Sequence, residues 1–295
     1  MTDLHSSDVV RARLDFSYDG TDFSGWASQP GLRTVQGEME AALARIIRDP
    51  ATGQGMPIRL TVAGRTDAGV HARHQVAHAD IPVESWGRMP GRCVRSPEVG
   101  LRDRLDGILP DDVSIHSVMV APEGFDARFA ATERRYAYRV CDVAALRDPL
   151  TRRHVMWHDG DLDLDALNAA SRTLTGLRDF APFCKAREGA TSIRDLKEFA
   201  WTRPQDGPDA GLLVATVRAD AFCHSMVRSL VGAVLPVGQG RRDLGWLADV
   251  AAGTERSQAV AVAPAHGLTL EQVSYPADAD LADRATLTRA RRTAI

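Results

Sequence analysis

The chain has 295 residues, of which 44% are hydrophobic, and its formal net charge is −3 at pH 7. A chain of this size can bury one large core or two cores of about 120 to 150 residues each, and we expect two. The slightly acidic charge argues against a protein that coats nucleic acid non-specifically, because that mode of binding needs many cations to neutralise phosphates. A local basic groove is still compatible with it.

The sequence predicts a protein without membrane-spanning or secretory segments. No apolar run reaches the roughly 18 residues that a membrane span needs, and the start MTDLHSSDVV lacks the charged and apolar regions of a signal peptide. The cysteines Cys93, Cys141, Cys184 and Cys223 are far apart and form no C-x-x-C pair. We therefore expect a soluble cytoplasmic protein whose cysteines are mostly buried, reduced thiols.

The first part of the chain predicts the order β-α-β-β-α-β. Apolar residues alternate at Leu14, Phe16 and Tyr18, which predicts a half-buried strand over 11–20. In 34–50 the apolar positions recur at helical spacing and Pro50 closes the segment, which predicts an amphipathic helix. The other predicted elements are strands over 58–69 and 74–83, a short helix over 101–110 and a strand over 112–120.

The second part of the chain repeats this order. Its predicted elements are a strand over 131–143, a helix over 162–177, a hairpin over 193–204 and 211–222, a helix over 226–238 and a strand over 267–275. Two such rounds predict the α+β class, with two ferredoxin-like (β-α-β-β-α-β) halves, antiparallel sheets and a catalytic cleft between the halves. We place the N-terminal half at 8–124, the C-terminal half at 125–276 and a helical or loosely ordered tail at 277–295.

Three histidines in the segment VAGRTDAGVHARHQVAH, residues 62–78, suggest a metal site. On a helix, His71, His74 and His78 would share one face and could hold zinc or iron. The β-branched residues that follow and Pro82 favour a strand instead. On a strand, His71 faces away from the other two, and His74 and His78 lie about 13 Å apart, too far to hold one ion together.

Asp67 is the other candidate reactive group of this segment. It lies between Gly64 and Gly69, and aspartate beside glycine is ordinary turn chemistry. A carboxylate on a tight turn at the end of a strand, with Arg65 two residues earlier, can also act as a nucleophile or general base. The residues alone leave both interpretations open.

Several segments resemble, in order, the motifs of the tRNA pseudouridine synthase A family. They are YDGTDFSGW with QPGLRTVQGEME, then AGRTDAGVHARHQVAH, FDARFAATERRYAYRV, FCHSMVRSLVGAVLPVGQG and APAHGLTLEQVSY. The resemblance covers about Arg11 to Tyr275, and motifs in family order over that length are far more specific than any one of them. It implies two ferredoxin-like halves around a catalytic cleft, and a homodimer whose subunits jointly hold one tRNA. It also implies isomerisation of uridines 38–40 in the anticodon arm, without metal or cofactor.

The resemblance implies roles for individual residues. Asp67 matches the family's catalytic aspartate, Tyr136 the active-site tyrosine and Arg228 the arginine that pairs with the aspartate. The positions that match RNA contacts are Arg65, Phe125, Asp126, Ala127, Arg128 and Phe129, together with Lys185 and Arg187 of the loop CKAREG. The sequence departs from the family pattern at Ala27, His74, Ala79 and Asp126, departures that bear on RNA contacts and leave the catalytic trio unchanged.

The isomerisation of uridine needs few catalytic side chains. Isomerisation breaks the bond from N1 to C1′, turns the uracil and reattaches it through C5, so one carboxylate can assist at the ribose by bonding to it or by taking a proton. We expect Arg228 to keep Asp67 ionised and Tyr136 to stack on the base and relay the C5 proton. Two alternatives stay open, a metal-dependent hydrolase that uses the three histidines and a non-catalytic protein that binds structured RNA.

Overall fold

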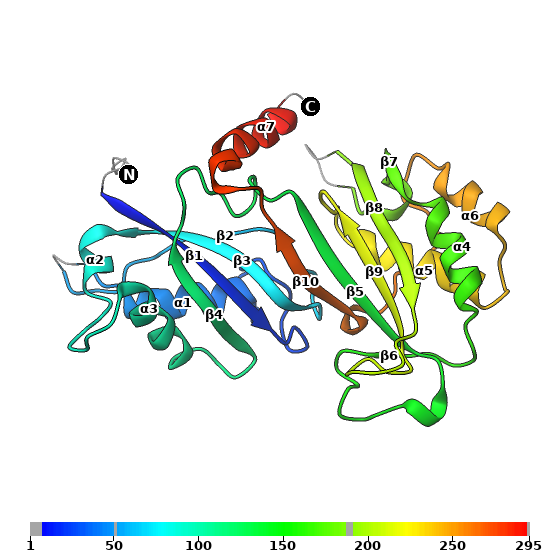
Figure 1. The fold of residues 1–295 in the computed structure, drawn as a ribbon, viewed down its shortest axis with the longest axis horizontal. Coiled ribbons are helices and arrows are strands. Elements are labelled where there is room, and N and C mark those ends of the chain that lie inside the picture. Colours follow the sequence, from blue (N-terminus) through cyan, green and yellow to red (C-terminus); the bar gives the residue numbers. More distant parts are fainter. Residues whose placement is uncertain (1–7, 50–51, 187–190, 294–295) are drawn as a thin grey trace. The chain divides into compact units, whose positions relative to one another are not determined.

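The structure, a computed structural model, describes residues 8–49, 52–186 and 191–293. The chain divides into two compact units, Met1–Ala131 with Tyr275–Arg289, and Thr132–Ser274 with Ala290–Ile295. The first unit thus ends a few residues after the predicted boundary at 124, and it also receives most of the segment predicted as a tail. Figure 1 shows the elements of both units.

The first unit is an antiparallel sheet with helices. Its elements are β1 (Val9–Tyr18), α1 (Val35–Ile46), β2 (Thr61–Val62), β3 (His71–Pro82), α2 (Val83–Gly87), α3 (Pro97–Asp106) and β4 (Val113–Val120). The strands run in the order β4-β1-β3, and β2 pairs with β3 through Thr61 opposite His78. Helix α7 (Leu281–Thr293), most of which belongs to this unit, follows the short 3-10 turn Asp278–Asp280.

Alternation along β1 builds the core of the first unit. Leu14, Phe16 and Tyr18 are at most 4% exposed, as the period-2 pattern of a one-sided strand requires. On the other face of β1, the Arg13 guanidinium donates to Asp15 at 2.8 Å. Helix α1 begins where the Thr34 hydroxyl accepts a hydrogen bond from the amide of Gly37, a typical N-cap.

The second unit has a longer antiparallel sheet. Its strands are β5 (Glu133–Cys141), β6 (Met156–Trp157), β7 (Gly176–Asp179), β8 (Ile193–Thr202), β9 (Leu213–Ala219) and β10 (Leu268–Ser274). They run in the order β10-β5-β9-β8-β7, and β6 pairs with β5 in parallel. Its helices are α4 (Leu164–Thr173), α5 (Met226–Gly238) and α6 (Leu244–Ala251), with 3-10 turns at Ala144–Leu146, Ala181–Phe183 and Ala265–Gly267.

Helix α5 is the central helix of the second unit. It packs against α4 and α6, and α4 packs against β8 (Figure 1). Nearly every residue of α5 is buried, Ser229 and Gly232 included. At Gly232 the main chain of Ala261 comes so close that a Cβ there would overlap the Ala261 carbonyl oxygen. Gly232 therefore lets another segment of the chain lie close against α5.

Some predicted elements differ from the observed ones. The strand predicted over 58–69 is reduced to Thr61–Val62, because the chain then enters a glycine-containing loop, and β3 begins earlier than predicted, at His71. Helices α2 and α6 and strands β6 and β7 were not predicted; three of these four have five residues or fewer. Within the part of the chain that the structure describes, no helix is long and apolar enough to cross a membrane.

The close approach at Gly232 gives a stability prediction. Replacing a helical glycine by alanine should gain about 1 kcal/mol from helix propensity, but overpacking a tight contact costs about 1–3 kcal/mol. We expect Gly232→Ala to be destabilised by up to about 2 kcal/mol, measured as the free energy of unfolding in urea. Gly87→Ala in α2 is the control, because nothing lies within 4 Å of a Cβ at that glycine. A Gly232→Ala protein as stable as wild type would contradict this account of the contact.

Candidate active site

Asp67 is the first residue of a tight turn in the loop between β2 and β3. The Asp67 carbonyl accepts a hydrogen bond from the amide of Val70 at 3.2 Å, and Gly69 has φ +76°. A positive φ at the third position of a turn is the conformation that glycine supplies without strain. The loop leaves the Asp67 side chain half-exposed and Arg65 exposed.

The segment 18–26 packs directly onto this loop. Gly25 has φ +93°, and a Cβ there would lie 3.0 Å from the Thr66 carbonyl oxygen and 3.3 Å from the carbonyl carbon of Asp67. A Cβ at Gly20 would overlap the main chain of Val70. Two backbone hydrogen bonds join the segments, from Trp26 to the Thr66 carbonyl and from Gly69 to the Phe23 carbonyl. The two glycines thus permit the approach that fixes the backbone on both sides of Asp67.

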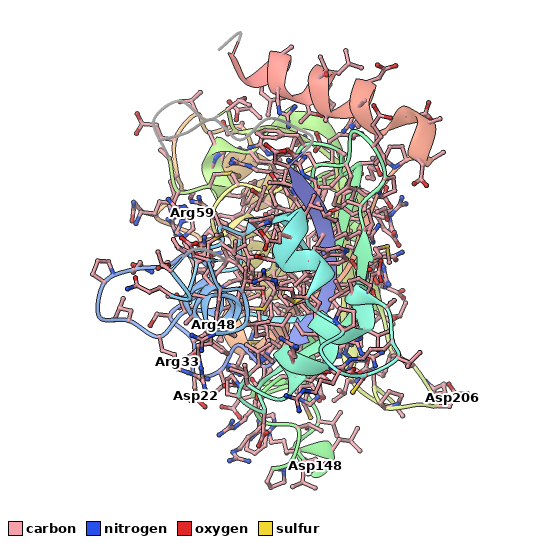
Figure 2. The ribbon with its side chains drawn as sticks, turned by 90° about the vertical axis from the view of Figure 1, so that its left-hand side faces the viewer. Asp22, Arg33, Arg48, Arg59, Asp148 and Asp206 are labelled. Atoms are coloured by element: carbon pink, nitrogen blue, oxygen red, sulfur yellow. A yellow bond between two sulfur atoms is a disulfide. The ribbon has the colours of Figure 1, made fainter. Side chains whose placement is uncertain are left out.

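Arg33 anchors the segment 29–40, which follows the segment 18–26 in the chain. Its guanidinium makes two hydrogen bonds to the Asp112 carboxylate, at 2.7 and 2.9 Å. It also lies 4.1 Å from the centre of the Phe23 ring, within the range of a cation–π contact. Arg33 is labelled in Figure 2, on the face of the first unit seen there. The ion pair therefore ties the segment 29–40 to the start of β4.

A buried polar network contacts the loop that carries Asp67. The hydroxyls of Tyr18 and Thr66 are 2.8 Å apart, and the Gln75 amide donates to the Tyr18 hydroxyl at 3.3 Å and to the Gly64 carbonyl at 2.9 Å. Burial raises the pKa of Tyr18 to about 12, so the phenol stays neutral at ordinary pH. Sequence analysis missed this network, and its one signal was Gln75, a polar residue at a fully buried strand position.

The three histidines have separate partners. His71 Nδ1 accepts from the Gly20 amide at 3.0 Å, and His78 Nδ1 accepts from the Ala127 amide at 3.0 Å. His74 Nε2 lies 3.7 Å from an Asp15 carboxylate oxygen. Burial, reinforced by Arg11, lowers the pKa of His78, which favours the neutral ring that this hydrogen bond needs. Over residues 8–49, 52–186 and 191–293, no group of three His, Cys, Asp or Glu side chains could hold a metal ion.

Tyr136 lies on β5, in the second unit. It is paired with Leu270 of β10 and Val217 of β9 and is only 6% exposed. The Phe222 ring meets it edge to face, with the two ring centres 5.1 Å apart and the planes at 88°. The Tyr136 side chain is therefore nearly buried and packs against a second aromatic ring.

Two arginines of the basic stretch around Tyr136 are internal. Arg139 is buried, and its guanidinium donates to the carboxylates of Asp209 and Glu271, at 2.8 Å in each case. Arg134 is also buried and donates to the Asp220 carbonyl at 2.8 Å. These two arginines therefore brace the second unit and add little to its surface charge.

Arg228 lies in the first turn of α5, also in the second unit. Its Nε donates to the Ala263 carbonyl at 2.7 Å, and the Ala263 amide donates to the Arg228 carbonyl at 3.0 Å. The next residue, Pro264, accepts from the Tyr138 hydroxyl at 2.8 Å. Burial raises the pKa of Tyr138, and the charge of Arg228 opposes the shift. The segment 263–264 thus connects Arg228 to the strand that carries Tyr136.

The predicted RNA-contact segment 125–129 is mostly internal. Phe125, Asp126 and Ala127 are at most 6% exposed, whereas Arg128 is exposed. The Asp126 carboxylate accepts from the amides of Arg128 and Phe129, each at 2.8 Å, and from Arg289 at 2.6 Å. Burial alone would raise the pKa of Asp126, but these donors bring it below its usual value. Asp126 therefore organises the loop that presents Arg128.

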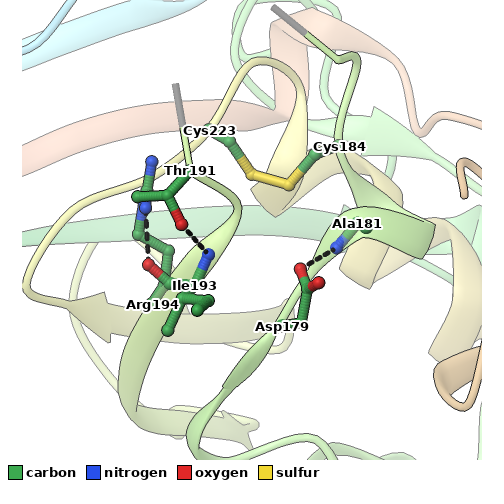
Figure 3. Close-up of a disulfide and its surroundings, with 7 residues drawn as sticks. All are labelled: Asp179, Ala181, Cys184, Thr191, Ile193, Arg194 and Cys223. Carbon is green, nitrogen blue, oxygen red and sulfur yellow. Dashed lines mark hydrogen bonds between the residues drawn. A yellow bond between two sulfur atoms is a disulfide. The ribbon is translucent and has the colours of Figure 1, made fainter. Parts of the chain in front are cut away.

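The cysteines correct one prediction. Cys184 and Cys223 were expected to be reduced thiols, but the structure joins them in a disulfide with a Cα–Cα distance of 5.7 Å (Figure 3). Of the other two, Cys93 is exposed and Cys141 is buried. Lys185, the residue after Cys184, is exposed, and its amide donates to the His224 carbonyl. Arg187, the other predicted contact of this loop, lies outside the described residues.

Comparison with known proteins places the chain in a family. A family model described as tRNA pseudouridine synthase matches residues 170–276. Proteins named tRNA pseudouridine synthase A are similar over nearly their whole length: the one from Streptomyces griseus is 54% identical over 99% of this chain and 98% of its own. Those from Cutibacterium acnes and Leifsonia xyli are 53% and 50% identical, each over 97% of this chain and 96% and 98% of their own. The chain belongs to the tRNA pseudouridine synthase A family.

Proposed function

We propose that this chain converts uridine to pseudouridine in the anticodon arm of tRNA. The names of its relatives support the reaction and the substrate. The observation in this chain that carries the proposal is the turn of Asp67, whose backbone is fixed on both sides by the segment 18–26. A pre-organised carboxylate is what a reaction at the ribose carbon needs.

Asp67 acts at the ribose in this proposal. Its carboxylate either bonds to C1′ or takes a ribose proton while the bond from N1 to C1′ breaks. The detached uracil then turns and C5 bonds to C1′. In the first route this breaks the bond between the Asp67 carboxylate and C1′, and in the second Asp67 returns the proton to the ribose. The proton then leaves C5 while N1 gains one. Atoms and charge balance without an external co-reactant. No observation on this chain distinguishes the two routes, and the turn geometry suits both.

Tyr136 and Arg228 are proposed to serve the same reaction. Tyr136 would stack on the uracil, which is worth about 1–3 kcal/mol per base and offsets part of the few kcal/mol needed to unstack it. Arg228 would keep Asp67 ionised. The anchoring of Arg228 through Ala263 supports a fixed position for its guanidinium. That Asp67 and Arg228 pair with each other stays a prediction.

We also infer that each unit is one ferredoxin-like half. The strand orders support this: β4-β1-β3, with β2 beside β3, in the first unit and β10-β5-β9-β8 in the second. Each has the neighbour pattern of a split β-α-β fold. The cleft between the halves, the homodimer, the cytoplasmic location and the absence of a cofactor stay predictions that rest on the resemblance. The metal-dependent hydrolase gains no support, because two of its three histidines, His71 and His78, accept hydrogen bonds from separate backbone amides.

The central test is Asp67→Asn. The amide is nearly isosteric and keeps the turn, so a residue with only a turn role would tolerate it. An amide can neither bond to the ribose nor take its proton, and we expect pseudouridine formation to fall roughly 10³-fold or more. The measurement is tritium release from tRNA labelled at uridine C5, with filter binding and a melting curve on the same protein. Asp22→Asn, which removes an exposed carboxylate from the adjoining motif, should retain activity. Near-normal release from Asp67→Asn would falsify the assignment of Asp67.

A second test addresses the network below the loop. Tyr18→Phe removes the hydroxyl that bonds to Thr66 and one of the two acceptors of the Gln75 amide, which costs about 1–3 kcal/mol of unfolding free energy. Because the network supports the loop and not the RNA, we expect kcat to fall while KM for tRNA stays unchanged. Tyr275→Phe is the control, because it removes a tyrosine hydroxyl outside this network, one that donates to the Ala127 carbonyl. An equal loss of kcat in both variants would mean that general destabilisation is responsible.

A third test concerns the exposed cations. Replacing Arg128 and Lys185 by alanine should weaken tRNA binding and flatten its salt dependence, by about 0.7 to 0.9 in the log–log slope for each phosphate that is no longer neutralised. Arg88→Ala is the matched control, since the guanidinium of that exposed arginine is already paired with Glu84. The measurement is the dissociation constant over a series of salt concentrations. A slope equal to that of wild type would place the RNA path elsewhere.

A further inference from the structure

We propose that the Cys184–Cys223 disulfide is a reversible redox site that controls how the second unit presents Tyr136 and Lys185 to tRNA. The inference rests on the proposed function for the role of these two residues. Every contact that carries it lies within the second unit. The disulfide itself joins residues 39 apart in the sequence, so no local sequence motif predicts it.

The disulfide connects two loops that both touch proposed site residues. Cys184 follows the 3-10 turn Ala181–Phe183 and directly precedes Lys185. Cys223 directly follows Phe222, the ring that packs edge to face on Tyr136. A backbone hydrogen bond of 3.1 Å from Lys185 to the His224 carbonyl runs beside the disulfide. The covalent bond therefore fixes the distance between the loop of Lys185 and the ring that positions Tyr136.

The segment after Cys223 contains a strained backbone conformation. Ser225 has φ 62°, the only positive φ of a non-glycine residue in the described ranges. Left-handed geometry at a residue with a side chain persists only where the surroundings hold it. Ser225 directly precedes α5, which carries Arg228 in its first turn. Releasing Cys223 from Cys184 removes a covalent constraint two residues before this strained position.

The two cysteines differ in exposure. Cys184 is 4% exposed, whereas Cys223 is half-exposed. A thiolate of a dithiol reductant can attack the Cys223 sulfur, form a mixed disulfide and release Cys184, which takes up a proton. The second thiol of the reductant then displaces Cys223, and the reductant leaves as its own disulfide. The protein gains two electrons and two protons, and the reductant loses them.

The expected consequence is a change in substrate handling. With the disulfide formed, the loops that carry Phe222 and Lys185 are covalently joined. After reduction the two loops can separate, so Tyr136 loses a fixed partner and Lys185 a fixed position. We expect the dissociation constant for tRNA and KM to rise several-fold on reduction, with a smaller change in kcat. A disulfide with only a stabilising role would lower the melting temperature on reduction without changing KM well below melting.

The experiment compares wild-type protein oxidised with oxidised glutathione and protein reduced with dithiothreitol. Alkylation and peptide mass spectrometry establish the state of Cys184 and Cys223 in each sample. The tRNA dissociation constant, KM and kcat are then measured below the melting temperature of both. Cys184→Ser and Cys223→Ser should behave like reduced wild type and ignore dithiothreitol. Cys93→Ser, which replaces an exposed thiol outside the pair, should keep the full redox response.

Three results would overturn the proposal: no disulfide under oxidising conditions, equal binding and kinetics in the two verified states, or a redox response that survives in Cys184→Ser. The proposed function fails separately. If wild type forms no pseudouridine in either state, the catalytic assignment is lost, whereas the tRNA dissociation constants of the two states still test the redox site.

Discussion

The position of Asp67 depends on a close approach of two backbone segments that only glycine permits. Gly20 and Gly25 bring the segment 18–26 against the loop that starts after β2, and the hydrogen bonds from Trp26 and Gly69 then join the two main chains. A Cβ at either glycine would push the segments apart. The Tyr18 hydroxyl beneath the loop meets Thr66, the residue before the aspartate. The segment 18–26 and the loop between β2 and β3 therefore hold the backbone of Asp67 in a fixed place.

The second unit also uses a close main-chain contact at a glycine to position a proposed site residue, Arg228. Gly232 lets the segment at Ala261 lie against α5, and Ala263 then binds Arg228 through both its amide and its carbonyl. Pro264 continues this contact to Tyr138, which stands two residues after Tyr136 on β5. In both units, a main-chain contact that a glycine permits lies beside the segment that carries or anchors a proposed catalytic residue. Such contacts tolerate few substitutions, because a shift of the backbone moves every group attached to it.

The elements and site groups that could be predicted from the sequence are those with a strong period or a motif. Apolar alternation predicted β1, and helical spacing predicted α5. Helix α2 and strand β6 were not predicted, because five and two residues are too few to show a periodic pattern. The proposed catalytic residues were identified by resemblance. The groups that support them come together only by tertiary folding: Gln75, Phe222 and the Cys184–Cys223 pair.

Three of the four departures from the family pattern fall on structural positions. Ala79 is fully buried on β3, and His74 lies beside Asp15 on the neighbouring strand. Asp126 uses its carboxylate to bind the backbone of its own loop and a guanidinium of α7. Because those donors hold its pKa below the ordinary value, the carboxylate stays ionised at neutral pH and the loop keeps its shape there. The aspartate therefore serves as an internal brace of the loop that carries the exposed Arg128.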